Sequence, residues 1–174
     1  MGLTDVLASI DPLGTLFGMV VDSNIATSTR IVVPPAYTLA LAEYARANPA
    51  DGAPLFRGVA RNPVYHAGGW ILQVQTGAEA MTLDLHVFTK APLKIDTYVH
   101  EMVHVAQYAA AGRVGFLVSY FGQSAATIAE RLMTRKPLNV MRSSPHENQA
   151  YELDRRFRQW LAKAHPEQMK NCSG

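Results

Sequence analysis

The sequence predicts a single domain of the α+β class, spanning residues 1–174. Because 48% of the 174 residues are apolar and 17% are charged, the chain can bury a sizeable core and lacks the composition of a disordered protein. Segments with strand-like patterns stand mainly before residue 90, and segments with helical periodicity dominate after it. Strands that precede helices in this way are typical of an α+β domain with a small sheet.

The first half of the chain predicts short elements separated by turn residues. Alternating apolar and polar residues predict strands, and a stretch rich in Gly, Pro and Asn predicts a loop. Residues 1–28 are expected to contain a short helix or to form a docking or regulatory segment, because their apolar part has no clear period. In chain order, the expected elements are an apolar segment at 3–22, a strand at 30–33 that Pro34 and Pro35 end, a helix at 36–47, a loop at 48–69, a strand at 70–76 and its hairpin partner at 81–89.

Helical periodicity in the second half predicts three helices. Asp96 or Thr97 can cap the first helix, and Gly112 ends it. The helices that follow are one at 114–133 and, after a loop at 135–144, one that Pro145 opens and that runs to about Ala164.

Two histidines stand four residues apart in the first of these helices, in the run His100-Glu101-Met102-Val103-His104. This spacing puts both imidazoles on one face of the helix, one turn apart, where they can bind one Zn²⁺. The intervening Glu101 then faces a water molecule on the metal and can act as a general base. The motif therefore predicts zinc as the cofactor, with His100 and His104 as ligands and Glu101 as the catalytic residue.

A catalytic zinc site needs a third protein ligand and leaves its fourth position to water. The best source is the segment at 145–152, at the start of the last helix, where Glu147 occupies an early turn. His146 competes with it, because imidazole is an excellent zinc ligand. The residues alone leave this choice open.

The run from His100 to Gln107, followed by Glu147-Asn148-Gln149-Ala150-Tyr151, resembles the Glu-zincin pattern of metallopeptidases. Over roughly residues 80–160, the chain is similar to a bacterial zincin-like metallopeptidase family that is often encoded with contractile injection systems and polymorphic toxins. The resemblance implies a zincin-like fold, with a small sheet packed on the motif helix, and hydrolysis of peptide or protein substrates by metal-activated water. It also implies that His100, His104 and Glu147 are the ligands and Glu101 the base, and that the chain associates with a secretion or injection apparatus.

One position departs from this pattern. Many Glu-zincins carry an acidic residue one turn after the ligand glutamate, where it orients a histidine, and here that residue is Tyr151. Glu152 and Asp154 are acidic, but their helical phase differs from that of Tyr151. This departure, and the lack of a counterpart for the residues before Gly69, keep a second hypothesis open. It is a non-catalytic zincin-fold module that is structural or associated with cargo.

Three further residues are candidates to contact substrate or an oxyanion. Tyr108 stands one turn after the second histidine of the motif, and His146 stands beside the candidate third ligand. His66 falls in the expected loop, where a substrate-binding group is plausible. The strand expected at 81–89 directly precedes the motif helix, and the edge of such a strand offers unpaired backbone donors and acceptors. We therefore expect an extended peptide to pair with it.

Composition limits the class of partner and the compartment. The net charge of +2 gives no basis for nucleic-acid binding, and the longest uncharged run, 114–129, is too short and too polar to span a bilayer. The single cysteine, Cys172, cannot form an intramolecular disulfide. Because the N-terminal segment has no basic region, we expect no Sec-type signal peptide. The expected location is the cytoplasm, or outside the cell after export by another route.

Overall fold

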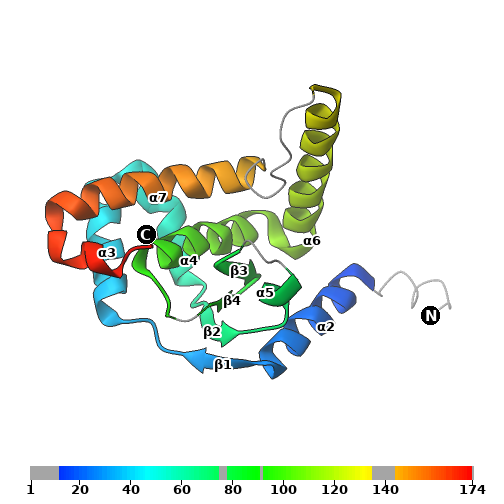
Figure 1. The fold of residues 1–174 in the computed structure, drawn as a ribbon, viewed down its shortest axis with the longest axis horizontal. Coiled ribbons are helices and arrows are strands. Elements are labelled where there is room, and N and C mark those ends of the chain that lie inside the picture. Colours follow the sequence, from blue (N-terminus) through cyan, green and yellow to red (C-terminus); the bar gives the residue numbers. More distant parts are fainter. Residues whose placement is uncertain (1–11, 75–77, 91, 135–143, 174) are drawn as a thin grey trace, which may run out of the picture.

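The computed structural model describes residues 12–74, 78–90, 92–134 and 144–173. Helices and one small sheet together confirm an α+β composition, although helices also precede and interrupt the strands (Figure 1). The elements in chain order are α2 (Pro12–Ala26), β1 (Ser28–Ile31), α3 (Pro35–Ala47), α4 (Pro49–Ala60), β2 (Val64–Gly68), α5 (Ile71–Val74), β3 (Ala80–Leu83), β4 (His86–Thr89), α6 (Ile95–Thr134), α7 (Pro145–Ala164) and the 3-10 helix η2 (Pro166–Asn171).

The strands form one mixed sheet in the order β1-β2-β4-β3. β2 and β4 run parallel, while β1 and β3 run antiparallel to their neighbours, so β1 and β3 are the two edges within the described residues. Tyr65 and Thr82 are both register partners of Val87, so the three side chains project from the same face. This face packs on α6, where the ring centroids of Tyr65 and Tyr98 lie 5.5 Å apart.

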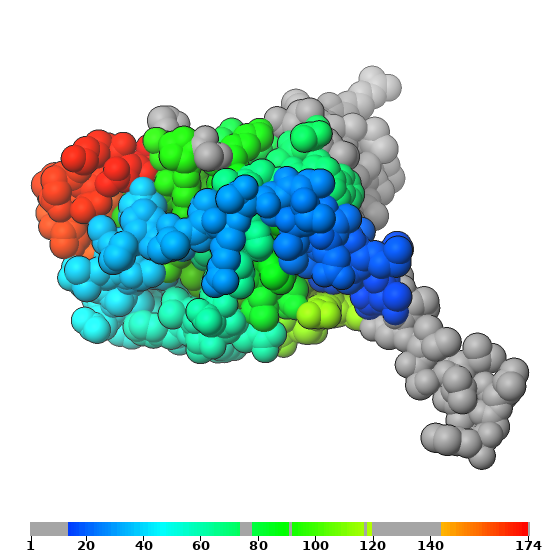
Figure 2. Space-filling view, turned by 90° about the horizontal axis from the view of Figure 1, so that it is seen from below, coloured from blue at the N-terminus to red at the C-terminus, as the bar shows by residue number. Residues whose placement is uncertain are grey.

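The opposite face of the sheet is covered by α2 and α5. Phe88 projects from this face and packs with Phe17 and Val21 of α2 and with Leu72 of α5. Figure 2 shows α2 and β1 lying across the surface of the molecule. The apolar segment expected at 3–22 thus supplies a helix that shares a core with the sheet, and its first nine positions lie outside the described residues.

Helix α6 consists of two helical halves that meet at Gly112. Gly112 has φ 71° and ψ 167°, a left-handed conformation that glycine adopts without a steric penalty. The prediction that one helix ends at Gly112 and another follows is therefore confirmed, and Figure 1 shows the second half turning away from the first. Over the described ranges, none of the helices combines the length and apolarity needed to cross a bilayer.

Helices α3, α4 and α7 cover the side of α6 that faces away from the sheet. Their buried residues include Leu41, Leu55 and Phe157, which form one core with Val99 of α6. The approach of α4 to α6 is close, because a Cβ atom on Gly58 would lie 2.7 Å from the backbone oxygen of Met102. The motif helix is thus held between the sheet and a layer of three helices.

The loop expected at 48–69 is wrong, because this range contains α4 and β2. Pro49 takes the first position of α4, where its missing N–H costs no hydrogen bond. Gly58 allows α4 to approach α6 rather than marking a turn. The glycine and proline content that predicted a loop therefore reflects how this helix starts and packs.

Two strand predictions also need correction. Where the strand at 70–76 was expected, residues 71–74 form the short helix α5, and residues 75 and 76 lie outside the described residues. The first residue of α5, Ile71, donates its backbone N–H to Oδ1 of the buried Asn24 at 2.8 Å. The strand expected at 81–89 is two strands, β3 and β4, separated by a turn in which Asp84 has φ 56°. The pair that was expected across 70–89 thus forms within 80–89.

We expect Gly58→Ala to destabilise the fold by about 1–3 kcal/mol, because the added methyl group would overlap the backbone of α6. Gly18→Ala is the matched control, since Gly18 lies inside helix α2 and a Cβ atom there meets nothing within 4 Å. Alanine should leave stability unchanged or raise it at that position. Urea unfolding of both variants measures the difference, and equal effects at the two glycines would contradict this packing.

Candidate metal centre

The three candidate ligands come from two helices that are distant in the sequence. His100 and His104 lie in the first half of α6, and Glu147 lies in the first turn of α7. The start of α7 is well defined, because Ser144 is its N-cap and accepts a hydrogen bond from the backbone N–H of His146 at 3.2 Å. Pro145 occupies the first helical position, as the sequence predicted.

The ligand atoms of these three residues converge. Nε2 of His100 lies 3.3 Å from Nε2 of His104 and 3.4 Å from Oε2 of Glu147, and Nε2 of His104 lies 3.5 Å from Oε1 of Glu147. His104 and Glu147 are buried and His100 is nearly so. Among the residues that the structure describes, this is the one group of three or more His, Cys, Asp or Glu side chains that could hold a metal ion.

A hydrogen-bonded glutamine orients the second histidine. Nδ1 of His104 lies 2.8 Å from Oε1 of Gln107, and because that oxygen can only accept, Nδ1 carries the hydrogen. The Nε2 atom of a neutral His104 is then the unprotonated one and faces the group. Gln107 also donates through Nε2 to the backbone oxygen of His146 at 3.1 Å and to Oε1 of Gln149 at 2.9 Å. One side chain thus fixes the ring and ties α6 to α7.

The first histidine has an aromatic neighbour where the family pattern has an acid. The ring centroids of His100 and Tyr151 lie 4.7 Å apart, and Tyr151 is 40% exposed. Glu152 forms ion pairs with Arg155 and Arg156 on the exposed side of α7. Glu152 is therefore directed away from the group.

Asp154 is the other acidic residue that could take the place of the acid, and it is affected by the charge of His100. Burial raises the pKa of its carboxyl to about 6, the Asp96 charge adds to this, and His100 opposes it. Its Oδ1 atom has no hydrogen-bond partner among the described residues. The charge of His100 thus opposes the rise in the pKa of Asp154, but no hydrogen bond joins Asp154 to His100 among the described residues. Asp154 therefore does not orient the histidine as the acid of the Glu-zincin pattern does.

Glu101 is not part of the three-residue group, but its charge acts on His104. Its side chain is only 4% exposed, and its Oε2 accepts a hydrogen bond of 2.7 Å from the hydroxyl of Thr82 on β3. The sequence did not identify Thr82 as a partner of Glu101. In one continuous strand over 81–89, Thr82 and Val87 would project from opposite faces of the sheet. The turn at Asp84 changes the phase, so Thr82 and Val87 share the face that packs on α6.

The residues that were predicted to contact substrate or an oxyanion lie in different parts of the fold. His146 lies next to Glu147, but its Nε2 is 2.9 Å from the hydroxyl of Ser119, and it is not part of the three-residue group. Tyr108 is buried in the core that α2 and α5 form with the sheet, with its ring centroid 4.0 Å from that of Phe116.

His66 is not in a loop, as the sequence suggested, but on β2. It projects with Phe88 from the sheet face opposite α6, and its Nε2 lies 3.0 Å from Nδ1 of His86. The structure therefore ties His146 to the group through Gln107, packs Tyr108 into an apolar core, and places His66 on the sheet face opposite α6.

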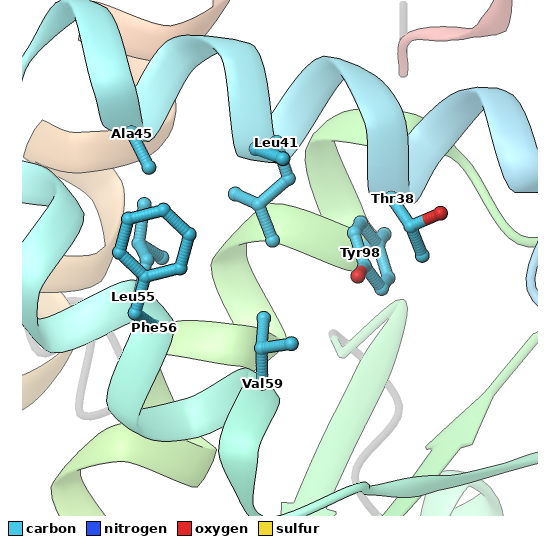
Figure 3. Close-up of a pocket in the computed structure, with 8 residues that line it drawn as sticks. Thr38, Leu41, Ala45, Leu55, Phe56, Val59 and Tyr98 are labelled. Atoms are coloured by element: carbon cyan, nitrogen blue, oxygen red, sulfur yellow. The ribbon is translucent and has the colours of Figure 1, made fainter.

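Two of the cavities lined by described residues lie elsewhere in the fold, and neither of these two is lined by the three ligands. One of about 270 Å³ lies between α2, the β3–β4 turn and α6, with Asp22, His86 and Arg113 in its wall. The other, of about 50 Å³, lies between α3 and α4 (Figure 3) and is far smaller than a typical ligand site. Its lining residues are Thr38, Leu41, Ala42, Ala45, Leu55, Phe56, Val59 and Tyr98.

Comparison with protein-family models, with curated proteins and with solved structures gave no match to this chain. The zincin resemblance therefore stays a prediction. The convergence of the ligand atoms is an observation of the structure itself.

Without a metal, the group forms a buried ion pair. Burial lowers the pKa of His104, but hydrogen bonding to Glu147 and the charges of Glu101 and Glu147 outweigh it and raise the pKa to about 9. Burial raises the pKa of Glu147, but hydrogen bonds with His100 and His104 outweigh it and hold the pKa well below its usual range. At neutral pH the metal-free site therefore carries a protonated His104 beside an ionised Glu147.

We expect the stability of the metal-free protein to fall as the pH rises from 6.5 to about 9. The pKa of His104 is higher in the folded chain than its ordinary value of 6.5, so this pair stabilises the fold fully below pH 6.5 and loses its contribution as His104 deprotonates. Urea unfolding across this range, with a chelator present, measures the slope. Glu147→Gln should remove most of it, and an unchanged slope in that variant would contradict the assignment.

Proposed function

We propose that this protein is a zinc-dependent metallopeptidase with a zincin-like fold. The observation that carries the proposal is the convergence of His100, His104 and Glu147, together with the carboxylate of Glu101, whose charge acts on His104 and which Thr82 holds. Zinc bound tetrahedrally at about 2.0–2.1 Å has ligand atoms about 3.3–3.5 Å apart. The two Nε2 atoms lie 3.3 Å apart, which matches that spacing, and each lies 3.4–3.5 Å from one of the two carboxylate oxygens of Glu147, Oε2 for His100 and Oε1 for His104.

The chemistry divides between the metal and the chain. Zinc in this group would lower the pKa of a water molecule toward neutrality and polarise a peptide carbonyl. Glu101 accepts the proton of the attacking water and passes it to the leaving amine. Gln107 keeps the Nε2 atom of His104 available as a ligand, since it binds the hydrogen on Nδ1.

The substrate we propose is an extended peptide that pairs with β3. Within the described residues, β3 has a strand neighbour on one side only, whereas β4 is paired on both sides. Only the first half of the range 81–89 therefore offers an edge. Backbone pairing at such an edge favours broad sequence specificity. The association with a secretion or injection apparatus rests on the family resemblance alone.

A non-catalytic zincin-fold module is the second candidate. The contact of Tyr151 with His100, in place of an acid, favours it. A site closed by a fourth protein ligand would support this function, whereas a position open to water would support the peptidase.

We expect Glu147→Ala to abolish stoichiometric zinc binding, because it removes the one carboxylate of the group. His146→Ala is the matched control and should bind zinc like the wild type, since its Nε2 contacts Ser119. Elemental analysis after zinc supplementation and dialysis measures both variants. Loss of zinc in His146→Ala with retention in Glu147→Ala would transfer the third position to His146.

We expect Glu101→Gln to keep its zinc and to lose peptide hydrolysis by at least about 10²–10⁴-fold, because an amide cannot accept the proton. Casein and a mixed peptide library serve as substrates, and zinc content is measured on the same samples. Unchanged turnover would refute the base assignment. Hydrolysis that is absent from the zinc-loaded wild type would favour the non-catalytic module.

A further inference from the structure

The hydrogen bond from Thr82 to Glu101 joins the sheet edge to the motif helix. The Thr82 hydroxyl lies 2.7 Å from Oε2 of Glu101 and 3.4 Å from its backbone oxygen, so the short contact is to the carboxylate. Both side chains are buried, at 7% and 4% exposure. Within the described residues, this is the one hydrogen bond to that carboxylate.

The sheet fixes the position of the hydroxyl. Thr82 is paired with Val87 of β4, and Val87 is fully buried in the core between the sheet and α6. A threonine side chain has one restricted torsion between its backbone and its hydroxyl. A one-residue slip of β3 would turn this side chain to the other face of the sheet.

Glu101, in contrast, carries its carboxylate on three rotatable bonds. Holding a side chain of this length in one geometry costs conformational entropy, and a hydrogen bond to a fixed partner offsets that cost. The hydroxyl of Thr82 carries a single hydrogen and donates it to Oε2, and within the described residues Oε1 accepts no hydrogen bond, so both of its lone pairs can face a water molecule.

We propose that Thr82 is a positioning residue for the general base, resting on the proposed peptidase function. It holds the carboxylate of Glu101 through Oε2, so that Oε1 points to the attacking water. The edge strand that we propose to bind peptide would thus also set the geometry of the base. The register of β3 would then fix the substrate and the base relative to one another.

Replacement of Thr82 tests this role in the zinc-loaded protein. Thr82→Val keeps the shape and removes the hydroxyl, and we expect kcat to fall roughly 10- to 100-fold while KM and zinc content stay unchanged. Thr82→Ser restores the hydroxyl and should recover kcat to within a few-fold. A Thr82→Val enzyme with the kcat of the wild type would overturn the proposal.

Thr89 provides the matched control. It is buried on β4, projects from the same sheet face as Val87, and donates its hydroxyl to the backbone oxygen of Lys90 at 2.9 Å. Thr89→Val should therefore lower stability without lowering kcat. An equal loss of kcat in Thr89→Val and Thr82→Val would show a general effect of the sheet and overturn the specific role.

A double-mutant cycle tests the contact without metal or substrate. In the metal-free protein, we expect Thr82→Val to lower the folding equilibrium constant roughly tenfold, because it leaves a buried carboxylate without its donor. In a Glu101→Leu background, which has no acceptor, the same change should lower it less than about twofold. Equal effects in the two backgrounds would overturn the contact.

The hydrolysis assay and the double-mutant cycle test the proposed function and the role of Thr82 independently. If the zinc-loaded wild type hydrolyses no peptide, the proposed function fails, and the cycle still decides whether Thr82 holds Glu101. If peptide is hydrolysed and the cycle shows no coupling, the function stands and the role of Thr82 is refuted.

Discussion

The packing of the first half of α6 between the sheet and the helices α4 and α7 is the constraint on which the site depends. Val99 and Val103 of this half lie four residues apart on one stripe of the helix and are buried. Because helical geometry places His100 and His104 beside this apolar stripe, the same packing that buries the stripe also holds the two imidazoles. The sheet then brings Thr82 to Glu101, and α7 brings Glu147 to the histidines. Each functional group thus reaches the site through the burial of its own element.

The relative position of α6 and α7 is fixed at both ends of their contact. Near the site, Gln107 donates to α7. At the start of α6, Asp96 accepts from the backbone N–H of Ser173 at 2.9 Å and lies 3.4 Å from Nη1 of Arg158 on α7. Arg158 also donates to the backbone oxygen of Ser173. A carboxylate in the first turn is also favourable to the helix dipole. The segment after α7 therefore clamps α6 at its first turn.

Burial makes the charges of the metal-free site interdependent. A buried carboxylate or imidazolium is costly alone, and removing one partner of such a pair is more damaging than removing both. His104 and Glu147 satisfy this need as an ion pair, and Thr82 supplies the donor for Glu101. A metal ion at the group would need an unprotonated Nε2 on His104 and the ionised carboxylate of Glu147, so metal binding and protonation of His104 compete.

The sequence by itself determined the features that depend on residues close together in the chain. The four-residue spacing of His100 and His104, the end of a helix at Gly112 and the start of α7 at Pro145 follow from helical periodicity and local backbone preferences. The third ligand was narrowed to two neighbouring residues for the same reason. In the tertiary structure the carboxylate of Glu147 lies with His100 and His104 on the first half of α6, whereas Nε2 of His146 contacts Ser119 on the second half.

Only the tertiary structure placed the groups whose partners are far apart in sequence. The glycines and prolines of α4 predicted a loop from the sequence. In the structure Gly58 instead allows α4 to approach α6, and this contact cannot be predicted from composition. Thr82 and Glu101 are 19 residues apart, and Gln107 and Gln149 are 42 apart. Periodicity over a short window carries no information about such pairs, and one turn at Asp84 reverses the face on which Thr82 lies. The ligand spacing on one helix is thus a local property of the sequence, whereas the surroundings of the candidate base are a property of the packed fold.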